Sequence, residues 1–101
     1  MKLEIKKYNH DLEMTTFSTK NSFVLSMDEL YFSTFFSSKN FGNYDYLYEK
    51  RLIPSFEDLM KKFNAYYDSP FLFKNEKDAE KFLEYLEPII IMETLTEDLW
   101  N

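Results

Sequence analysis

Cysteine is absent from this chain of 101 residues, and glycine and histidine each occur only once. The lack of Cys excludes a thiol nucleophile, a disulfide framework and any zinc or iron–sulfur site built on cysteine. One Gly is too few for a phosphate-binding P-loop or a dinucleotide-binding fingerprint, and one His is too few for a His-rich metal site. We therefore expect no cofactor, no metal ion and no enzymatic activity.

Long apolar runs are also missing. The longest continuous run, residues 89–92, has four residues, whereas a membrane helix needs roughly 20. Charged residues interrupt any apolar stretch in residues 1–11, so this segment does not resemble a signal peptide. Together with the absence of Cys, these features indicate a reducing, soluble compartment. We expect the protein in the cytoplasm, that of the host cell if a phage encodes it, and without membrane contact.

Aromatic residues, in contrast, make up 20% of the chain. Each buries a large apolar area and so helps to offset the entropy lost on ordering the chain. The length fits one domain with one core. The pattern of segments described below predicts a single compact α+β domain over residues 1–101, with an N-terminal β-hairpin and a small antiparallel sheet packed against about three helices.

Alternation of apolar and polar residues predicts two N-terminal strands. Residues 2–8 alternate, with Leu3 and Ile5 on one side, and residues 12–16 alternate in the same way. The polar break at residues 9–11 between them predicts a tight β-hairpin. Further strands are expected at residues 22–25, 44–49, 71–73 and 89–92.

Two helices are expected in the middle of the chain. The first covers residues 27–38, where Ser26 and Glu29 have capping-box spacing, and its β-branched and aromatic content leaves a strand as the alternative. The second covers residues 56–67 and begins after Ser55, which is a favourable N-cap residue. The single Gly lies between these helices, in a turn expected at residues 40–43.

A third helix is expected to begin after Asn75 and to end at about Glu87, because Pro88 disfavours a helical residue before it. Ala79, Phe82 and Leu86 form its apolar stripe. Residues 89–92 then form a buried strand, and continuation of the helix is the alternative.

The net charge of −6 is concentrated in this third helix and the residues after it. Residues 1–75 contain ten Lys or Arg and ten Asp or Glu, whereas residues 76–98 contain eight acids against Lys77 and Lys81. Four of the acids, which we call the acidic face, are spaced by four, four and three residues: Glu76, Glu80, Glu84 and Glu87. At about 100° per residue they lie within roughly 80° of arc beside the apolar stripe.

The acidic face has two interpretations. Successive carboxylates about 6 Å apart along the helix would resemble the phosphates of a nucleic-acid strand and could dock on a basic groove. Alternatively, the face is an ordinary solvated helix surface, on which the pairs Lys77–Glu80 and Lys81–Glu84 relieve part of the repulsion between like charges four residues apart.

A second candidate contact surface consists of Tyr44, Tyr46 and Tyr48, which share one side of the strand expected at residues 44–49. Tyrosine combines contact area with a polar group and is enriched at interfaces. The alternative is that this tyrosine side of the strand covers the core.

Catalytic arrangements have little support. His10 with Asp11 and Glu13 could be imagined as an acid–base group, but His10 lies in a predicted turn without a nucleophile at useful spacing. The many acids contain numerous pairs, and nothing in the sequence selects one of them. We therefore expect His10 to be a solvent-exposed turn residue.

Residues 72–89, from Leu72 through Asn75 and Phe82 to Ile89, resemble a strand–cap–helix unit of small uncharacterised phage and mobile-element proteins. The short, acidic, Cys-free and Gly-poor chain is similar in type to phage-encoded inhibitors of host defence or replication proteins, including anti-CRISPR proteins and DNA mimics. This resemblance implies a non-enzymatic inhibitor that blocks a basic, nucleic-acid-handling host protein, such as a CRISPR effector, by occlusion or nucleic-acid mimicry.

The expected partner is therefore a protein with a basic surface, with no direct contact to nucleic acid. Glu76, Glu80, Glu84 and Glu87 would meet its Lys or Arg residues, and the three tyrosines would anchor the contact. The alternative is a structural or assembly protein that associates through aromatic surface, with itself as a homodimer or within a larger complex.

Overall fold

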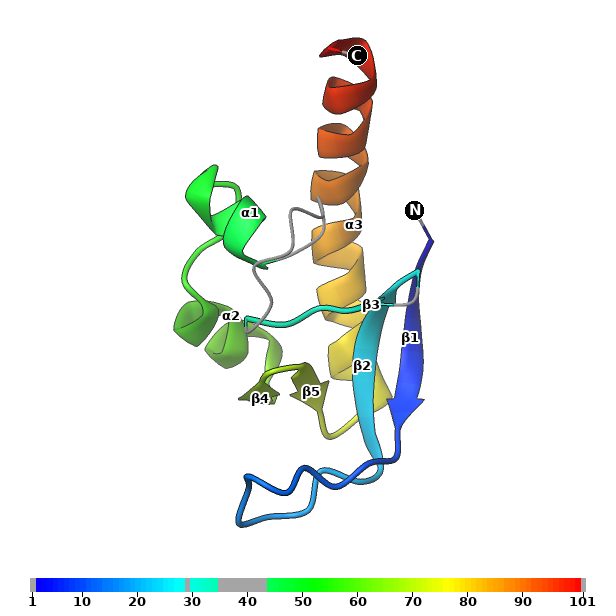
Figure 1. The fold of residues 1–101 in the computed structure, drawn as a ribbon, viewed down its shortest axis with the longest axis vertical. Coiled ribbons are helices and arrows are strands. Elements are labelled where there is room, and N and C mark those ends of the chain that lie inside the picture. The colour runs from blue at the N-terminus through cyan, green and yellow to red at the C-terminus, as the bar shows by residue number, and fades with distance from the viewer. Residues whose placement is uncertain (1, 29, 35–43, 101) are drawn as a thin grey trace.

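The strand β2 organises the sheet of this protein. The computed structural model describes residues 2–28, 30–34 and 44–100, and for residues 94–100 the backbone alone. Its elements are, in chain order, β1 (Leu3–Tyr8), β2 (Ser22–Met27), β3 (Leu30–Tyr31), α1 (Tyr44–Glu49), α2 (Phe56–Phe63), β4 (Ala65–Asp68), β5 (Phe71–Phe73) and α3 (Glu76–Trp100) (Figure 1). All strand pairs are antiparallel, in the order β1-β2-β5-β4, with β3 also paired to β2. The predicted α+β class, with an N-terminal hairpin in an antiparallel sheet against three helices, is confirmed.

The loop between the two strands of the N-terminal hairpin is longer than predicted. β1 pairs with β2, with Ile5 opposite Leu25, so the expected strand at residues 12–16 is wrong. Residues 9–21 form a loop whose polar side chains satisfy its backbone: the Leu12 N–H donates to Thr19 Oγ1 at 3.0 Å, and Thr15 Oγ1 donates to the Leu12 carbonyl at 2.9 Å. Such local side-chain bonds compete with a strand ladder.

The helix expected at residues 27–38 is not formed in its described part. Met27 belongs to β2, the chain turns at Asp28 with a positive φ of 59°, and Leu30–Tyr31 return as β3. The Ser26 hydroxyl, expected to cap a helix, donates instead to the Asp28 carbonyl at 2.8 Å. The alternative to this helix, a strand, is therefore correct for Leu30–Tyr31. The rest of the expected helix, residues 35–38, and the turn at residues 40–43 lie outside the described residues.

Residues 44–49 form the helix α1, and the strand expected there is wrong. Helical spacing places Tyr44 and Leu47 on one side, and both are buried in the main core. Burial of this pair outweighs the strand preference of the tyrosines, which reflects packing more than backbone preference.

The second helix is confirmed but ends earlier than expected. The Ser55 hydroxyl accepts a hydrogen bond from the Asp58 N–H at 3.4 Å and caps the N-terminus of α2. Asn64 ends the helix in the left-handed conformation, with φ of 63°, so Tyr67 belongs to β4 instead. The predicted strand at residues 71–73 is confirmed as β5.

The third helix begins as expected, because Asn75 Oδ1 accepts a hydrogen bond from the Asp78 N–H at 2.9 Å. It does not end before Pro88, however, and continues to Trp100, so the strand expected at residues 89–92 is wrong. A proline inside a helix removes one backbone hydrogen bond. Ile90, which is 1% exposed in the core, gains enough burial to hold the chain in the continued helix.

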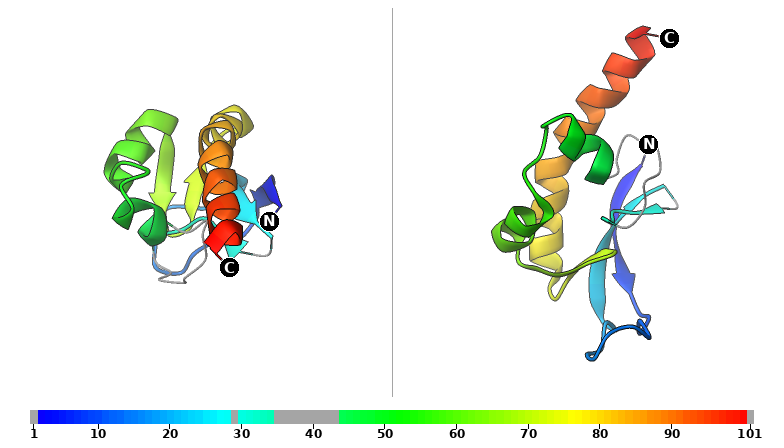
Figure 2. Two further views of the ribbon diagram at one scale, coloured as in Figure 1. Left: turned by 90° about the horizontal axis from the view of Figure 1, so that it is seen from above. Right: turned by 60° about the vertical axis from the view of Figure 1, so that its left-hand side comes forward.

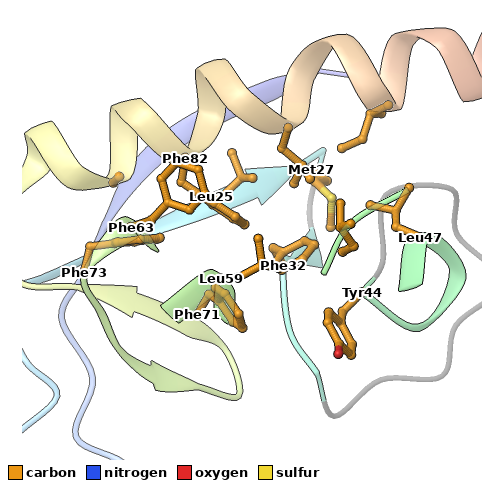
Figure 3. Packing of buried hydrophobic residues seen from close by; sticks show 14 residues of the cluster. Leu25, Met27, Phe32, Tyr44, Leu47, Leu59, Phe63, Phe71, Phe73 and Phe82 are labelled. Atoms are coloured by element: carbon orange, nitrogen blue, oxygen red, sulfur yellow. The ribbon is translucent and has the colours of Figure 1, made fainter. Parts of the chain in front are cut away.

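All three helices contribute residues to one core with the sheet, and the ring of Phe82 of α3 points into this core (Figure 3). Its ring centroid is 5.2 Å from those of Phe32 and Phe63 and 5.5 Å from those of Phe71 and Phe73. The opposite face of the sheet carries a smaller cluster of Tyr8, Val24 and Leu72, with Leu12, Tyr66 and Tyr67 packed against it. No helix in the described part of the chain has the length and apolar character to cross a membrane.

Candidate functional site

The acidic face of α3 lies on the surface, as the sequence predicted. Glu76, Glu80, Glu84 and Glu87 are all exposed. They are placed there because Ala79, Phe82 and Leu86, on the neighbouring arc of α3, are fully buried in the core. Packing of the apolar stripe therefore fixes the direction in which the acidic face points.

The carboxylates of the acidic face have no partner within the described residues. The ion pairs there join Lys2 and Lys6 to Glu4, Lys20 to Asp11, and Lys50 to Glu93. The pairs Lys77–Glu80 and Lys81–Glu84 that the sequence suggested do not form. The repulsion between neighbouring glutamates, a few tenths of a kcal/mol per pair, is thus not relieved by an ion pair with any of the described residues.

An apolar residue extends the acidic face. Ile91 follows Glu87 by four residues, so it lies on the same side of the continuous helix, and 49% of its surface is exposed. The spacing of three and four residues continues to Ile91 in the sequence and could have indicated it. It was missed because a strand was expected at residues 89–92.

Glu93 differs from the acidic face. It faces α1, where its Oε2 accepts hydrogen bonds from the Tyr46 hydroxyl at 3.0 Å and from Lys50 Nζ at 3.1 Å. Lys50 Nζ also lies 4.7 Å from the centroid of the Tyr46 ring. The hydrogen bond with Tyr46, and then Glu93, raise the pKa of Lys50 above its usual value. This group joins α1 to α3.

The three predicted tyrosines do not form one surface. Tyr44 is buried, its hydroxyl accepts a hydrogen bond from the Phe56 N–H at 2.9 Å, and burial raises its pKa. Tyr46 is half-buried and bonded to Glu93. Only Tyr48, which stacks on Tyr44 at 5.4 Å, exposes about half of its surface, 48%. Of the three tyrosines that the assembly alternative would use, one is thus exposed; its other aromatic residue, Trp100, has a side chain outside those that the structure describes.

The residues considered for acid–base chemistry do not converge. His10 packs edge-on to Tyr8 at 5.2 Å and is exposed, as expected for a turn residue. Asp11 accepts a hydrogen bond from Ser18 at 2.8 Å, which with Lys20 lowers its pKa, and Glu13 is exposed. Within the part of the chain that the structure describes, no group of three or more His, Asp or Glu could hold a metal ion.

Comparisons with protein-family models, with curated proteins and with solved structures found no match to this chain. Of the surfaces described above, the acidic face combines a fixed direction, four exposed carboxylates and no ion pair with the described residues.

Proposed function

We propose that this protein is a non-enzymatic binding protein of the cytoplasm that inhibits a basic, nucleic-acid-handling protein by covering its binding groove. The observation that carries the proposal is the acidic face of α3, on which four exposed carboxylates have no partner within the described residues. The class of partner follows from charge complementarity.

The carboxylates suit such a groove in spacing as well as in charge. Positions four residues apart on α3 are separated by about 6 Å along the helix axis, which is comparable to the phosphate spacing of a nucleic-acid strand. Lys and Arg residues that receive phosphates would therefore receive these carboxylates. Docking on Lys or Arg residues would also relieve the repulsion among the glutamates, which favours binding of a cationic partner.

Charge mainly accelerates association and excludes wrong partners, whereas buried apolar anchors supply most of the affinity of an interface. Ile91 takes the role of anchor that the sequence assigned to the tyrosines, because it is half exposed and adjoins Glu87 on the same side of α3. Tyr44 has no part in the contact, since its side chain belongs to the core.

The test is a comparison of two triple charge reversals. The first changes Glu80, Glu84 and Glu87 to Lys. The matched control changes Glu13, Glu49 and Glu57 to Lys. All six residues are exposed. Because each variant replaces three Glu by three Lys, the two have the same net charge and differ only in where the changed charges lie.

The partner is first isolated by pull-down from the cytoplasm of the native host, and its association rate is then measured against salt concentration. We expect reversal of the acidic face to slow association by about tenfold or more and to flatten the salt dependence. The control should retain most of the rate. Equal rates and equal salt slopes for the two variants would show that the acidic face is only a solvated helix surface.

A further inference from the structure

The outer edge of β1 carries backbone groups that are not bonded to any described residue. β1 pairs with β2 over its whole length, and among the strands that the structure describes it pairs with no other. Lys2 and Asp28 continue this ladder, because the Asp28 N–H donates to the Lys2 carbonyl at 2.9 Å. In an antiparallel pair every second residue bonds to the neighbouring strand, so Leu3, Ile5 and Lys7 direct their N–H and C=O groups away from β2. β1 therefore offers a template for one further strand.

The same three residues of β1 share one face of the sheet. Leu3 and Ile5 are half-buried and pack against the main core, to which α3 contributes. Lys7 lies on this face by strand alternation and is exposed. Residues directly opposite each other on paired strands have their side chains on the same face. Every second side chain of an added strand would therefore point toward the α3 side of the sheet.

The acidic face of α3 lies on the flank of this helix that is nearer to β1. At about 100° per residue, Tyr85 falls roughly 90° to one side of the apolar stripe of α3, and the acidic face falls on the other side. The centroid of the Tyr85 ring lies 5.0 Å from that of Phe63 in α2, so the Tyr85 flank faces α2. Figures 1 and 2 show α2 and β1 on opposite sides of α3. The acidic face is therefore turned toward the outer edge of β1.

We propose that an extended segment of the basic partner adds to β1 as a further strand, with Lys or Arg at every second position turned toward the acidic face. This inference rests on the proposed function, from which it takes the charge of the partner. Alternate residues of a strand are about 6.6 Å apart, and glutamates four positions apart on α3 are separated by about 6 Å along the axis. In strand addition, main-chain hydrogen bonds supply affinity and alternate side chains supply specificity.

A second copy of this chain fits the β1 edge less well than a basic segment does. Two β1 strands paired about a two-fold axis would bring the acidic faces of both α3 helices toward each other, and like charges across an interface are repulsive. A basic segment neutralises these charges instead. Lys7 adds one restriction, because a Lys or Arg directly opposite it would be destabilising.

The test uses a short capped peptide in which Lys and Thr alternate, and a control peptide of the same composition in which all Lys residues are consecutive. Only the alternating peptide places all of its Lys on one side of an added strand. We expect it to bind the full chain about fivefold more tightly than the control, in titrations followed by NMR. At saturating peptide, the amide protons of Leu3, Ile5 and Lys7 should exchange more slowly, whereas that of Lys6, which is bonded to β2, should not change.

A matched pair of variants at Lys7 separates the backbone contribution from that of charge. Lys7→Pro and Lys7→Ala both remove the charge, but only the proline removes the outward N–H. Proline is tolerated on an edge strand where this N–H faces away from the ladder. Lys7→Pro should bind the alternating peptide about threefold or more weakly than Lys7→Ala. Circular dichroism checks that both variants are folded, and if Lys7→Pro is not, amide exchange in the wild type decides.

Equal affinities for the two peptides, equal affinities of the two folded Lys7 variants, or unchanged amide exchange along β1 would each overturn strand addition. The triple charge reversal of the acidic face distinguishes this outcome from failure of the proposed function. Loss of peptide binding on reversal, without an effect of Lys7→Pro, would keep the acidic face as the docking surface and remove strand addition alone. Peptide binding that survives the reversal would contradict both proposals.

Discussion

The part of α3 before Pro88 and the part after it differ in what they present to solvent. Before Pro88, the inner side packs on the sheet through Phe82 and Leu86, and the outer side is charged. From Pro88 to Met92, the exposed side is apolar, with Ile91 and Met92 at 49% and 63% exposure. One continuous helix thus carries two surfaces of different chemistry.

The difference shows that the two parts are held in different ways. The first part is anchored by core packing and by the Asn75 cap, so its acidic face has a fixed direction even without a partner. The second part is held by Ile90 and by Glu93, which bonds to α1. Charge fits the well-anchored part, because steering needs no burial, whereas an apolar surface gains stability only when something covers it.

The largest change in the free energy of unfolding should come from Phe82, which anchors the first part of α3 in the core. Phe82→Ala should lower the free energy of unfolding by about 3–5 kcal/mol, because it leaves a cavity among the rings of Phe63, Phe71 and Phe73. Met92→Ala, in the second part, should change it by less than about 0.5 kcal/mol at dilute concentration. Urea denaturation measures both. Similar losses for the two variants would mean that the parts are held alike.

A smaller change in the free energy of unfolding, of opposite sign, should come from Pro88, where the two parts of α3 meet. Pro88 is exposed and lacks the N–H that would bond to the Glu84 carbonyl. Pro88→Ala restores this bond and should raise the free energy of unfolding by up to about 3 kcal/mol. Glu87→Ala, at the adjacent exposed position, is the control and should be nearly neutral. Far-UV circular dichroism should show unchanged helix content; a large gain in helicity would mean that the helix of the wild type ends at Pro88.

The elements that the sequence predicted well are those specified by local chemistry. Ser55 and Asn75 each accept a backbone N–H three residues later, and both helices begin where these caps place them. Phe82 and Leu86 follow a helical period, so their burial could be read from spacing alone. The same spacing placed the acidic face correctly on the exposed side of α3.

The elements that it missed depend on packing between distant residues. Alternating tyrosines at residues 44–49 favour a strand locally, but Tyr44 and Leu47 have helical spacing too, and contact with a distant core decided between them. Pro88 favours a helix end locally, and burial of Ile90 overrode it. The sequence left open that the tyrosines cover the core, and for Tyr44 this alternative is correct; contact with distant residues decided between it and an exposed contact surface.

The smallest effect concerns the contact that holds the second part to α1. Tyr46 and Glu93 raise the pKa of Lys50 in the folded protein above 10.5, its ordinary value. A group whose pKa is raised on folding contributes stability that is fully present below the unfolded pKa and is lost as the pH rises through the folded pKa. Lys50→Gln should therefore be less stable than the wild type at pH 7 to 9, by a small amount because the lysine is exposed.

This difference should shrink as the pH rises above about 10.5 and the wild-type lysine loses its proton. Lys61→Gln is the matched control, since Lys61 is exposed on α2 and takes part in no ion pair within the described residues. Its difference from the wild type should not follow the same pH profile. The measurement is the urea midpoint from pH 7 to 11. A Lys50→Gln difference that is constant over this range would mean that the charge of Lys50 does not hold α1 to the second part of α3, and that the Tyr46–Glu93 hydrogen bond and the burial of Ile90 anchor it.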